Sequence, residues 1–175
     1  EKAIKLEKDA LAQIETITAD NARLVSNLHA NLGGLYRMNG HPDLAREHME
    51  KSISLLDQFN LLHINDSIPQ IANYAMFLTE QQEPERGISE LQKLSGIIKE
   101  YHSDDCLDYA KVQETLGTIY LMTANLPQAK THFKRAFKIY EKIWADEPEM
   151  IEAKYQEIQE LYPQIGFCIG KNLSG

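Results

Sequence analysis

The sequence predicts an all-α fold in which antiparallel helix hairpins stack into an α-solenoid. Three observations indicate this fold: an internal repeat of 42 residues, an apolar stripe with helical spacing in each repeat, and turn-forming residues near the middle of each repeat. A fixed period of roughly 20 to 50 residues is the signature of a repeat architecture. The chain is therefore expected to form one array of similar units with a continuous core.

The repeat is anchored by small residues, because Gly33, Ala75 and Gly117 follow one another at 42-residue intervals. The same interval separates Ala45, Gly87 and Ala129, then Met49, Leu91 and Phe133, and then Leu56, Ile98 and Tyr140. This register predicts the second helix of a truncated repeat over residues 1–20, full repeats over 26–62, 67–102 and 107–145, a further first helix over 148–162, and a tail over 163–175. We expect Ala3, Ala10, Ile14 and Ile17 to face inward on the first segment, and Ile165, Phe167 and Ile169 to anchor the tail.

Each repeat divides into two helices. Leu32, Gly33 and Tyr36 lie on one face of a helix, and Leu116, Gly117 and Tyr120 repeat the pattern. The segments 39–42, 82–84 and 125–127 contain proline with asparagine, glycine or glutamate, which is typical of turns. Small residues on both helices of a repeat predict that the two backbones approach closely.

These residues resemble the tetratricopeptide repeat. The family pattern is clearest in Leu116, Gly117, Tyr120, Ala129, Phe133 and Ala136, and the 42-residue period resembles the repeats of kinesin light chain. The resemblance implies a right-handed superhelix of hairpins that binds other proteins. His29 and Gln113 depart from the pattern, since a bulky apolar residue is usual at their position.

Composition limits the classes of partner. The chain has 175 residues and a formal charge of -8, with a sequence pI near 5.2, which disfavours nucleic acid and anionic membrane surfaces. No apolar run approaches the roughly 18 to 20 residues that cross a bilayer. Two cysteines, Cys106 and Cys168, are too few for a disulfide framework. These features favour a cytoplasmic location.

The face of the first helices opposite the packed stripe is the candidate binding surface, because such faces line the concave groove of these solenoids. The predicted groove residues are Asn27, Asn31, Met38, Asn73, Met76, Glu80, Lys111, Glu114, Thr115 and Met122. Asparagine amides can bind an extended main chain, while methionines fill irregular side-chain pockets. The resemblance supports this interpretation for Asn31 and Asn73, since kinesin light chain repeats commonly carry asparagine there. Glu80, Lys111 and Glu114 would set the preferred charge of the ligand.

No segment predicts catalysis, a metal site or a cofactor. The segment 102–106 collects histidine, two aspartates and cysteine, but it lies between helices, and we expect Ser103, Asp104 or Asp105 to cap the next helix. His48 and His132 occupy equivalent repeat positions and are interpreted as packing or surface residues.

The sequence thus predicts a scaffold or adaptor that binds a peptide or loop of another protein in its groove. Two alternatives remain: a sensory segment of a larger regulator, and a purely structural repeat segment. We also expect homo-association through the open N-terminal end, since repeat arrays require capped ends.

Overall fold

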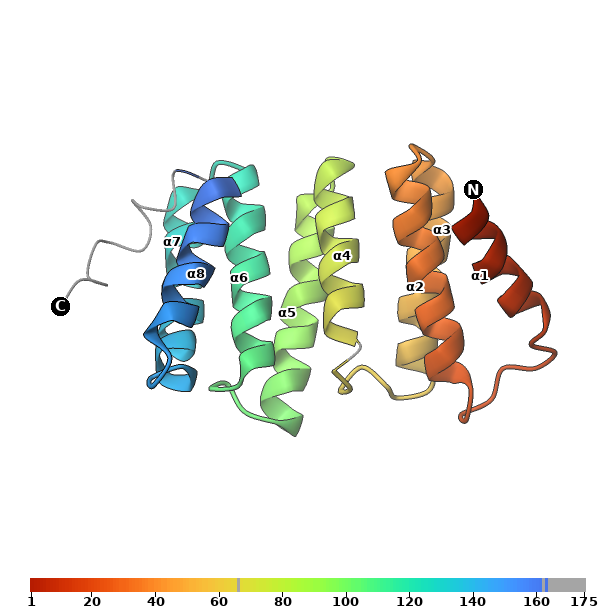
Figure 1. Cartoon of the computed structure of the whole chain (residues 1–175), viewed down its shortest axis with the longest axis horizontal. Helices are drawn as coiled ribbons and strands as arrows, with labels where there is room; N and C mark the ends of the chain where they lie inside the picture. The colour runs from red at the N-terminus through yellow and green to blue at the C-terminus, as the bar shows by residue number, and fades with distance from the viewer. Residues whose placement is uncertain (66, 162, 164–175) are drawn as a thin grey trace. The chain divides into compact units, whose positions relative to one another are not determined.

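The computed structural model describes residues 1–65, 67–161 and 163. Within these residues all regular secondary structure is helical, which confirms the predicted all-α class. The helices are α1 (Lys2–Ala12), α2 (Ala22–Met38), α3 (Pro42–Gln58), α4 (Ser67–Glu80), α5 (Pro84–Tyr101), α6 (Leu107–Met122), α7 (Leu126–Ile143) and α8 (Pro148–Leu161), labelled in Figure 1. The chain divides into two compact units, residues 1–78 and 79–175. The tail anchors Ile165, Phe167 and Ile169 lie outside the described residues.

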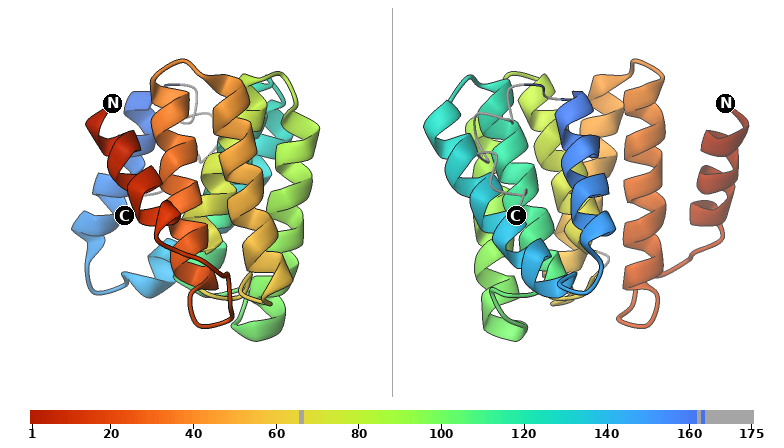
Figure 2. Two further views of the ribbon diagram at one scale, coloured as in Figure 1. Left: turned by 90° about the vertical axis from the view of Figure 1, so that its right-hand side faces the viewer. Right: turned by 60° about the vertical axis from the view of Figure 1, so that its left-hand side comes forward.

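In the first unit, α2 and α3 form an antiparallel hairpin (Figure 2). The stripe predicted on α2 faces α3, and Leu32 and Tyr36 share a buried cluster with Met49. Gly33 marks the closest approach: a Cβ at this position would lie 3.2 Å from the Ala45 carbonyl oxygen and 3.2 Å from the Met49 amide nitrogen. The small residues of this repeat therefore do allow the backbones to meet.

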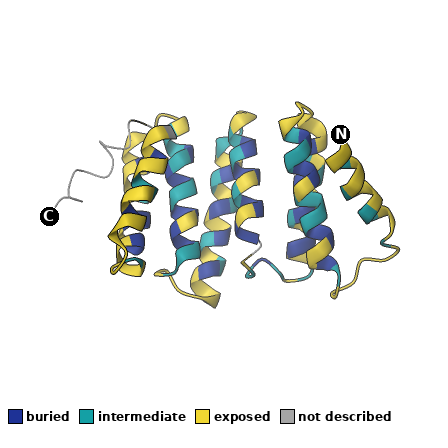
Figure 3. Ribbon diagram, viewed as in Figure 1, coloured by how far each residue is buried: buried dark blue, intermediate teal, exposed yellow. Residues whose placement is uncertain are grey.

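The N-terminal helix α1 packs beside α2, and its residues Ile4 and Leu11 contact the same cluster. The predicted inward stripe was partly wrong, because Ala3 and Ile17 are exposed while Ile4 and Leu11 point inward. Figure 3 shows that exposed residues cover most of this helix.

The helix predicted over residues 1–20 ends at Ala12. The chain turns after it, and the Asn21 side chain holds the turn: its Oδ1 accepts from the Thr18 amide at 2.8 Å, and its Nδ2 donates to the Thr16 carbonyl at 2.9 Å. β-Branched Thr16, Ile17 and Thr18 lose side-chain freedom in a helix, so this segment favours the turn.

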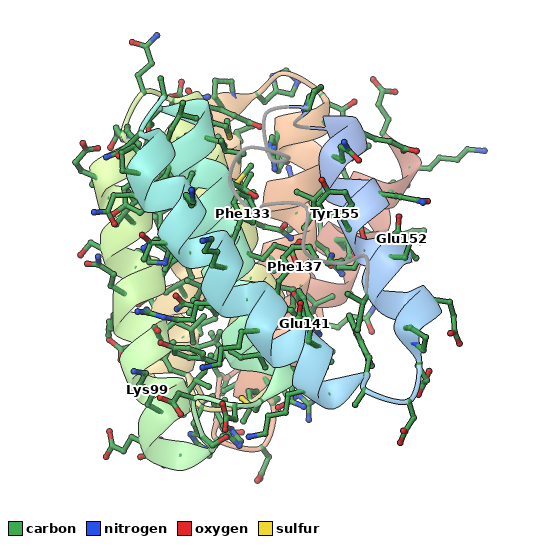
Figure 4. All side chains as sticks on the ribbon, turned by 90° about the vertical axis from the view of Figure 1, so that its left-hand side faces the viewer. Lys99, Phe133, Phe137, Glu141, Glu152 and Tyr155 are labelled. Carbon is green, nitrogen blue, oxygen red and sulfur yellow. The ribbon has the colours of Figure 1, made fainter. Side chains whose placement is uncertain are left out.

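In the second unit, α6 and α7 form the equivalent hairpin, with α5 packed on α6 and α8 on α7. A Cβ at Gly117 would lie 2.9 Å from two atoms of the Phe133 ring. Phe137 of α7 meets Tyr155 of α8 edge to face at 6.1 Å between centroids; both are labelled in Figure 4. The further first helix expected over residues 148–162 is thus α8, and it packs through an aromatic pair.

The turn inside each repeat has the same backbone geometry. Gly40, Gln82 and Ala124, spaced at 42-residue intervals, have φ angles of 74°, 65° and 58°. This left-handed region suits glycine and strains other residues. Each turn is followed within two or three residues by a proline in the first turn of the next helix, a position where the missing N–H costs no hydrogen bond.

Candidate functional site

A groove lined by amide side chains lies between α2 and α4 in the first unit. We call it the amide groove; its lining residues are Asn27, Ala30, Asn31, Asn65, Pro69, Gln70 and Asn73, and its cavity is about 300 Å³. Five of these seven residues carry a carboxamide, which offers both a donor and an acceptor. The arrangement can therefore bind groups that present alternating N–H and C=O, as an extended main chain does.

A buried hydrogen-bond network holds α4 in place beneath the groove. Ser26 of α2 lies with its Oγ 2.8 Å from Gln70 Oε1 and 3.1 Å from Ser52 Oγ, and the Ser52 hydroxyl also donates to Gln70 Oε1. The Gln70 Nε2 donates to Asn27 Oδ1 at 2.5 Å. Since Ser26 and Ser52 are fully buried, this network fixes the Gln70 and Asn27 side chains at the groove wall.

A second cavity lies beside the amide groove along α2. We call it the Gly34 pocket; it is about 160 Å³ and is lined by Ala30, Gly34, Arg37, Met38, Met49, Ser52, Gln70 and Asn73. Ala30, Gln70 and Asn73 line both cavities, so the two lie side by side. Met38, which is 84% exposed, lies at the rim of the Gly34 pocket.

The structure thus brings together four of the predicted groove residues, Asn27, Asn31, Asn73 and Met38. The amide of Asn31 already has a partner, because its Nδ2 donates to Glu7 Oε1 of α1 at 3.1 Å. Met76 is half-buried and Glu80 is exposed, and neither lines these two cavities.

The predicted groove residues of the second unit line neither the amide groove nor the Gly34 pocket. Lys111 lines a cavity of about 290 Å³ between α6, α7 and α8, together with Trp144, Met150 and Lys154. Thr115 donates its hydroxyl to the Lys111 carbonyl oxygen at 3.0 Å, and Met122 is exposed at the end of α6.

Glu114 was expected to set the charge of the groove, but internal partners occupy it. Its Oε2 accepts from the Tyr140 hydroxyl at 2.6 Å, and its Oε1 lies 3.0 Å from Lys154 Nζ. Burial and the Glu114 carboxylate raise the pKa of Tyr140. Burial lowers the pKa of Lys154, but the Glu114 and Glu157 carboxylates together outweigh this effect, so the pKa of Lys154 is raised. Glu114 therefore joins α6, α7 and α8.

The two histidines at equivalent repeat positions are packing residues. His48 stacks on Tyr36 with centroids 5.4 Å apart, and His132 stacks on Tyr120 at 5.3 Å. Each histidine also hydrogen-bonds to the residue of its own repeat, His29 or Gln113, that departs from the repeat pattern. His48 Nδ1 lies 2.8 Å from His29 Nδ1, and His132 Nδ1 lies 2.9 Å from Gln113 Oε1. Sequence reasoning missed these pairs, although His29 and Gln113 depart from the pattern at one and the same repeat position.

The loop 102–106 caps α6, but not through the predicted residues. Cys106 is the N-cap, and its Sγ accepts from the Tyr109 amide at 3.4 Å. Ser103 instead accepts from the Asp105 amide within the loop, while Asp105 pairs with Lys142. The expectation that Ser103, Asp104 or Asp105 caps this helix was wrong.

Two further findings concern the part of the chain that the structure describes. It contains no group of three or more histidine, cysteine, aspartate or glutamate side chains placed to hold a metal ion. In the same residues, no helix combines the length and apolar character needed to cross a membrane.

Comparison with known proteins identifies the repeat. Residues 67–142 match the tetratricopeptide repeat family, which confirms the resemblance seen in the sequence. The fold is similar to the crystal structure of BtubC (BKLC) from P. vanneervenii, a kinesin light chain-like repeat protein, with a TM-score of 0.74 and 19% sequence identity.

That alignment covers 94% of this chain and 66% of BtubC, so the chain spans just under two thirds of the length of its structural relative. No curated protein sequence matches the chain. The comparisons therefore establish a tetratricopeptide-type fold, whose members generally bind other proteins and are typically not catalytic.

Proposed function

We propose that this protein is an interaction module that binds an extended segment of another protein in the amide groove. The observation that carries the proposal is the convergence of Asn27, Asn31 and Asn73, from two helices, on one cavity. Asn31 and Asn73 occupy equivalent positions 42 residues apart, so they present similar groups along the groove.

The chemistry of the groove favours main-chain recognition. An extended segment has an unpaired N–H and C=O on alternate residues, and carboxamides match both. None of the seven lining residues is charged, so the groove selects neither a cation nor an anion by itself. Gln70 and Asn27 are held by hydrogen bonds before the ligand arrives, which reduces the entropy that binding would cost.

The Asn31 amide has one N–H engaged before binding, and its second N–H and its carbonyl oxygen remain for a ligand. Glu7 of α1 accepts its hydrogen bond, and the other carboxylate oxygen of Glu7 is buried without a partner. A ligand carbonyl can replace Glu7 at Asn31 if α1 shifts.

The experiment is a titration of a partner captured from the source organism against the wild type and the Asn31→Ala, Asn73→Ala double variant. Each lost hydrogen bond to a ligand amide costs about 0.5 to 1.5 kcal/mol, so affinity should fall by roughly tenfold. The matched control replaces two exposed helix amides outside the groove, Gln92→Ala and Gln159→Ala. Equal affinities for the two double variants would remove the proposal and favour a regulatory or purely structural role.

A further inference from the structure

A row of lysines follows the exposed side of α7 in the second unit. We call it the lysine row; its members are Lys130, Lys134, Lys138 and Lys142, and all four are exposed. Residues four apart form one ridge on the surface of a helix, and each step of four advances about 6 Å along the helix axis. The lysine row therefore follows one ridge of α7 over about 18 Å.

The lysine row concentrates positive charge in an acidic chain. The formal net charge of the chain is -8, yet Glu141 is the only acidic residue of α7. Lys142 pairs with Asp105 in the loop before α6, and the charge of Lys138 also acts on that carboxylate. Among the residues that the structure describes, no hydrogen bond or ion pair engages the other three ammonium groups of the row. These three groups can therefore bind an anionic partner.

The repeat does not require the lysine row. The equivalent positions of the other full repeats, 84 and 42 residues earlier, are Arg46, Glu50, Ser54 and Gln58 on α3, and Ile88, Gln92, Gly96 and Glu100 on α5. The buried residues of α7 lie at other positions, so the lysines take no part in the core. Like charges four residues apart on a helix repel each other and destabilise it. The row thus opposes folding slightly, which indicates a role in binding.

We infer that the lysine row binds an extended acidic segment of another protein, with carboxylates at alternate positions. Successive side chains of an extended chain point to opposite sides, so alternate residues share one side at intervals of about 6.6 Å. Four such carboxylates span about 20 Å, close to the length of about 18 Å that the row covers. A lysine ammonium is a point charge on a flexible stem, so it can follow this small difference in spacing.

Two other polyanions fit this surface less well. Domains that bind nucleic acid are basic, with a pI above about 9, whereas this chain has a sequence pI near 5.2. A helix that lies in a membrane interface inserts its apolar face into the lipid, but the apolar face of α7 is buried in its own unit. A short acidic segment requires neither property. The row shares no residue with the amide groove, so the inference does not depend on the proposed function.

The probe is the peptide Ser-Glu-Ser-Glu-Ser-Glu-Ser-Glu with a fluorescent label, titrated with the whole chain at low ionic strength and followed by fluorescence anisotropy. The test variant carries Lys130→Gln, Lys134→Gln and Lys138→Gln. The matched control carries Lys2→Gln, Lys5→Gln and Lys51→Gln. The control removes three exposed lysines of α1 and α3, so both variants change the net charge equally. The test variant should weaken binding by about tenfold, as the loss of three exposed ion pairs predicts, and the control by less than about twofold.

Folding and spacing are checked alongside. Removal of the like-charge repulsion should leave the melting temperature of the test variant unchanged or higher, so that a loss of binding does not come from unfolding. A peptide of the same composition, Ser-Ser-Ser-Ser-Glu-Glu-Glu-Glu, should bind several-fold more weakly, because two of its four carboxylates face away from the row. Equal affinities for the two peptides would overturn the alternate spacing.

Three results would overturn the inference as a whole. The first is no binding of either peptide, and the second is an equal loss of binding in the two triple variants. The third is tighter binding of an oligothymidylate of eight nucleotides, or of vesicles of equal parts phosphatidylcholine and phosphatidylserine, that the test variant loses. That result would assign the lysine row to nucleic acid or to a membrane surface.

Discussion

The two adjacent glycines of α2 provide a sharp test of the packing described above. Both lie in the interior of one helix, so replacing either by alanine gains up to about 1 kcal/mol of helix propensity. At Gly34 the new methyl group meets nothing within 4 Å. Gly34→Ala should therefore stabilise the protein by about 0.5 to 1 kcal/mol.

At Gly33 the same change should have the opposite sign. The new Cβ would stand 2.5 Å from Met49 Cγ and 3.2 Å from two backbone atoms of α3. Met49 is only 4% exposed, so its side chain has to repack, and the two backbone contacts require α2 and α3 to shift apart by a small distance. Overpacking of this kind costs about 1 to 3 kcal/mol, and subtracting a propensity gain of about 1 kcal/mol leaves a net loss of about 0 to 2 kcal/mol.

The assay is urea unfolding followed by circular dichroism on the wild type and both variants. The expected difference in unfolding free energy between Gly34→Ala and Gly33→Ala is about 2 kcal/mol, well above the usual error of such comparisons. Changes of the same sign and size in the two variants would refute the close contact between α2 and α3 at Gly33.

Three further changes test other parts of the structure. Burial, together with His48 and Lys51, lowers the pKa of His29 from 6.5 to about 4. The unfolded chain then binds more protons between these pH values, so unfolding free energy should fall as pH drops from 6.5 to 4, by about 1 to 2 kcal/mol after allowing for screening at a half-buried site. His29→Gln, which copies Gln113, should flatten that slope, and an unchanged slope would contradict the assignment. Ala124→Gly should stabilise the α6–α7 turn by up to about 1 kcal/mol because Ala124 has a φ of 58°, whereas a lower melting temperature would count against this turn geometry. Gly117→Leu should cost at least about 2 to 3 kcal/mol through contact with Phe133, and an unaltered melting temperature would show that α6 and α7 do not pack there.

The fold could be predicted from the sequence because each repeat has to meet the same physical requirements, and the residues that meet them recur at equivalent positions. Gly33 and Gly117 recur where helices touch, and Gly40, Gln82 and Ala124 recur where the chain turns. The end of α1 could not be predicted in this way. The turn that follows it is held by the Asn21 side chain, which bonds the main chain of Thr16 and Thr18.

The candidate site was predictable only in part. Helical periodicity places Asn27, Asn31 and Asn73 on the helix faces opposite the packed stripe, and in the structure all three line one cavity. The periodicity of the sequence does not reveal which polar residues have partners inside the protein. Glu114 was assigned to the groove, but it lies against Tyr140 of α7 and Lys154 of α8, so its partners depend on how these helices pack on α6.

The Gly34 pocket could not be recognised from the sequence either. Gly33 and Gly34 are adjacent and chemically identical, and only the position of α3 distinguishes the packed glycine from the open one. The buried network of Ser26, Ser52 and Gln70 joins three helices, so its members cannot be linked by the spacing within one repeat.

The most direct test of the proposed function is photo-crosslinking from the groove itself. A photoreactive residue in place of Asn73, or in place of Ser54, which is exposed on α3, is irradiated in extract of the source organism, and the crosslinked segments are sequenced by mass spectrometry. We expect position 73 to yield one recurring segment of a partner and position 54 not to yield it. Recovery of the same partner segment from position 54 alone would contradict binding in the amide groove.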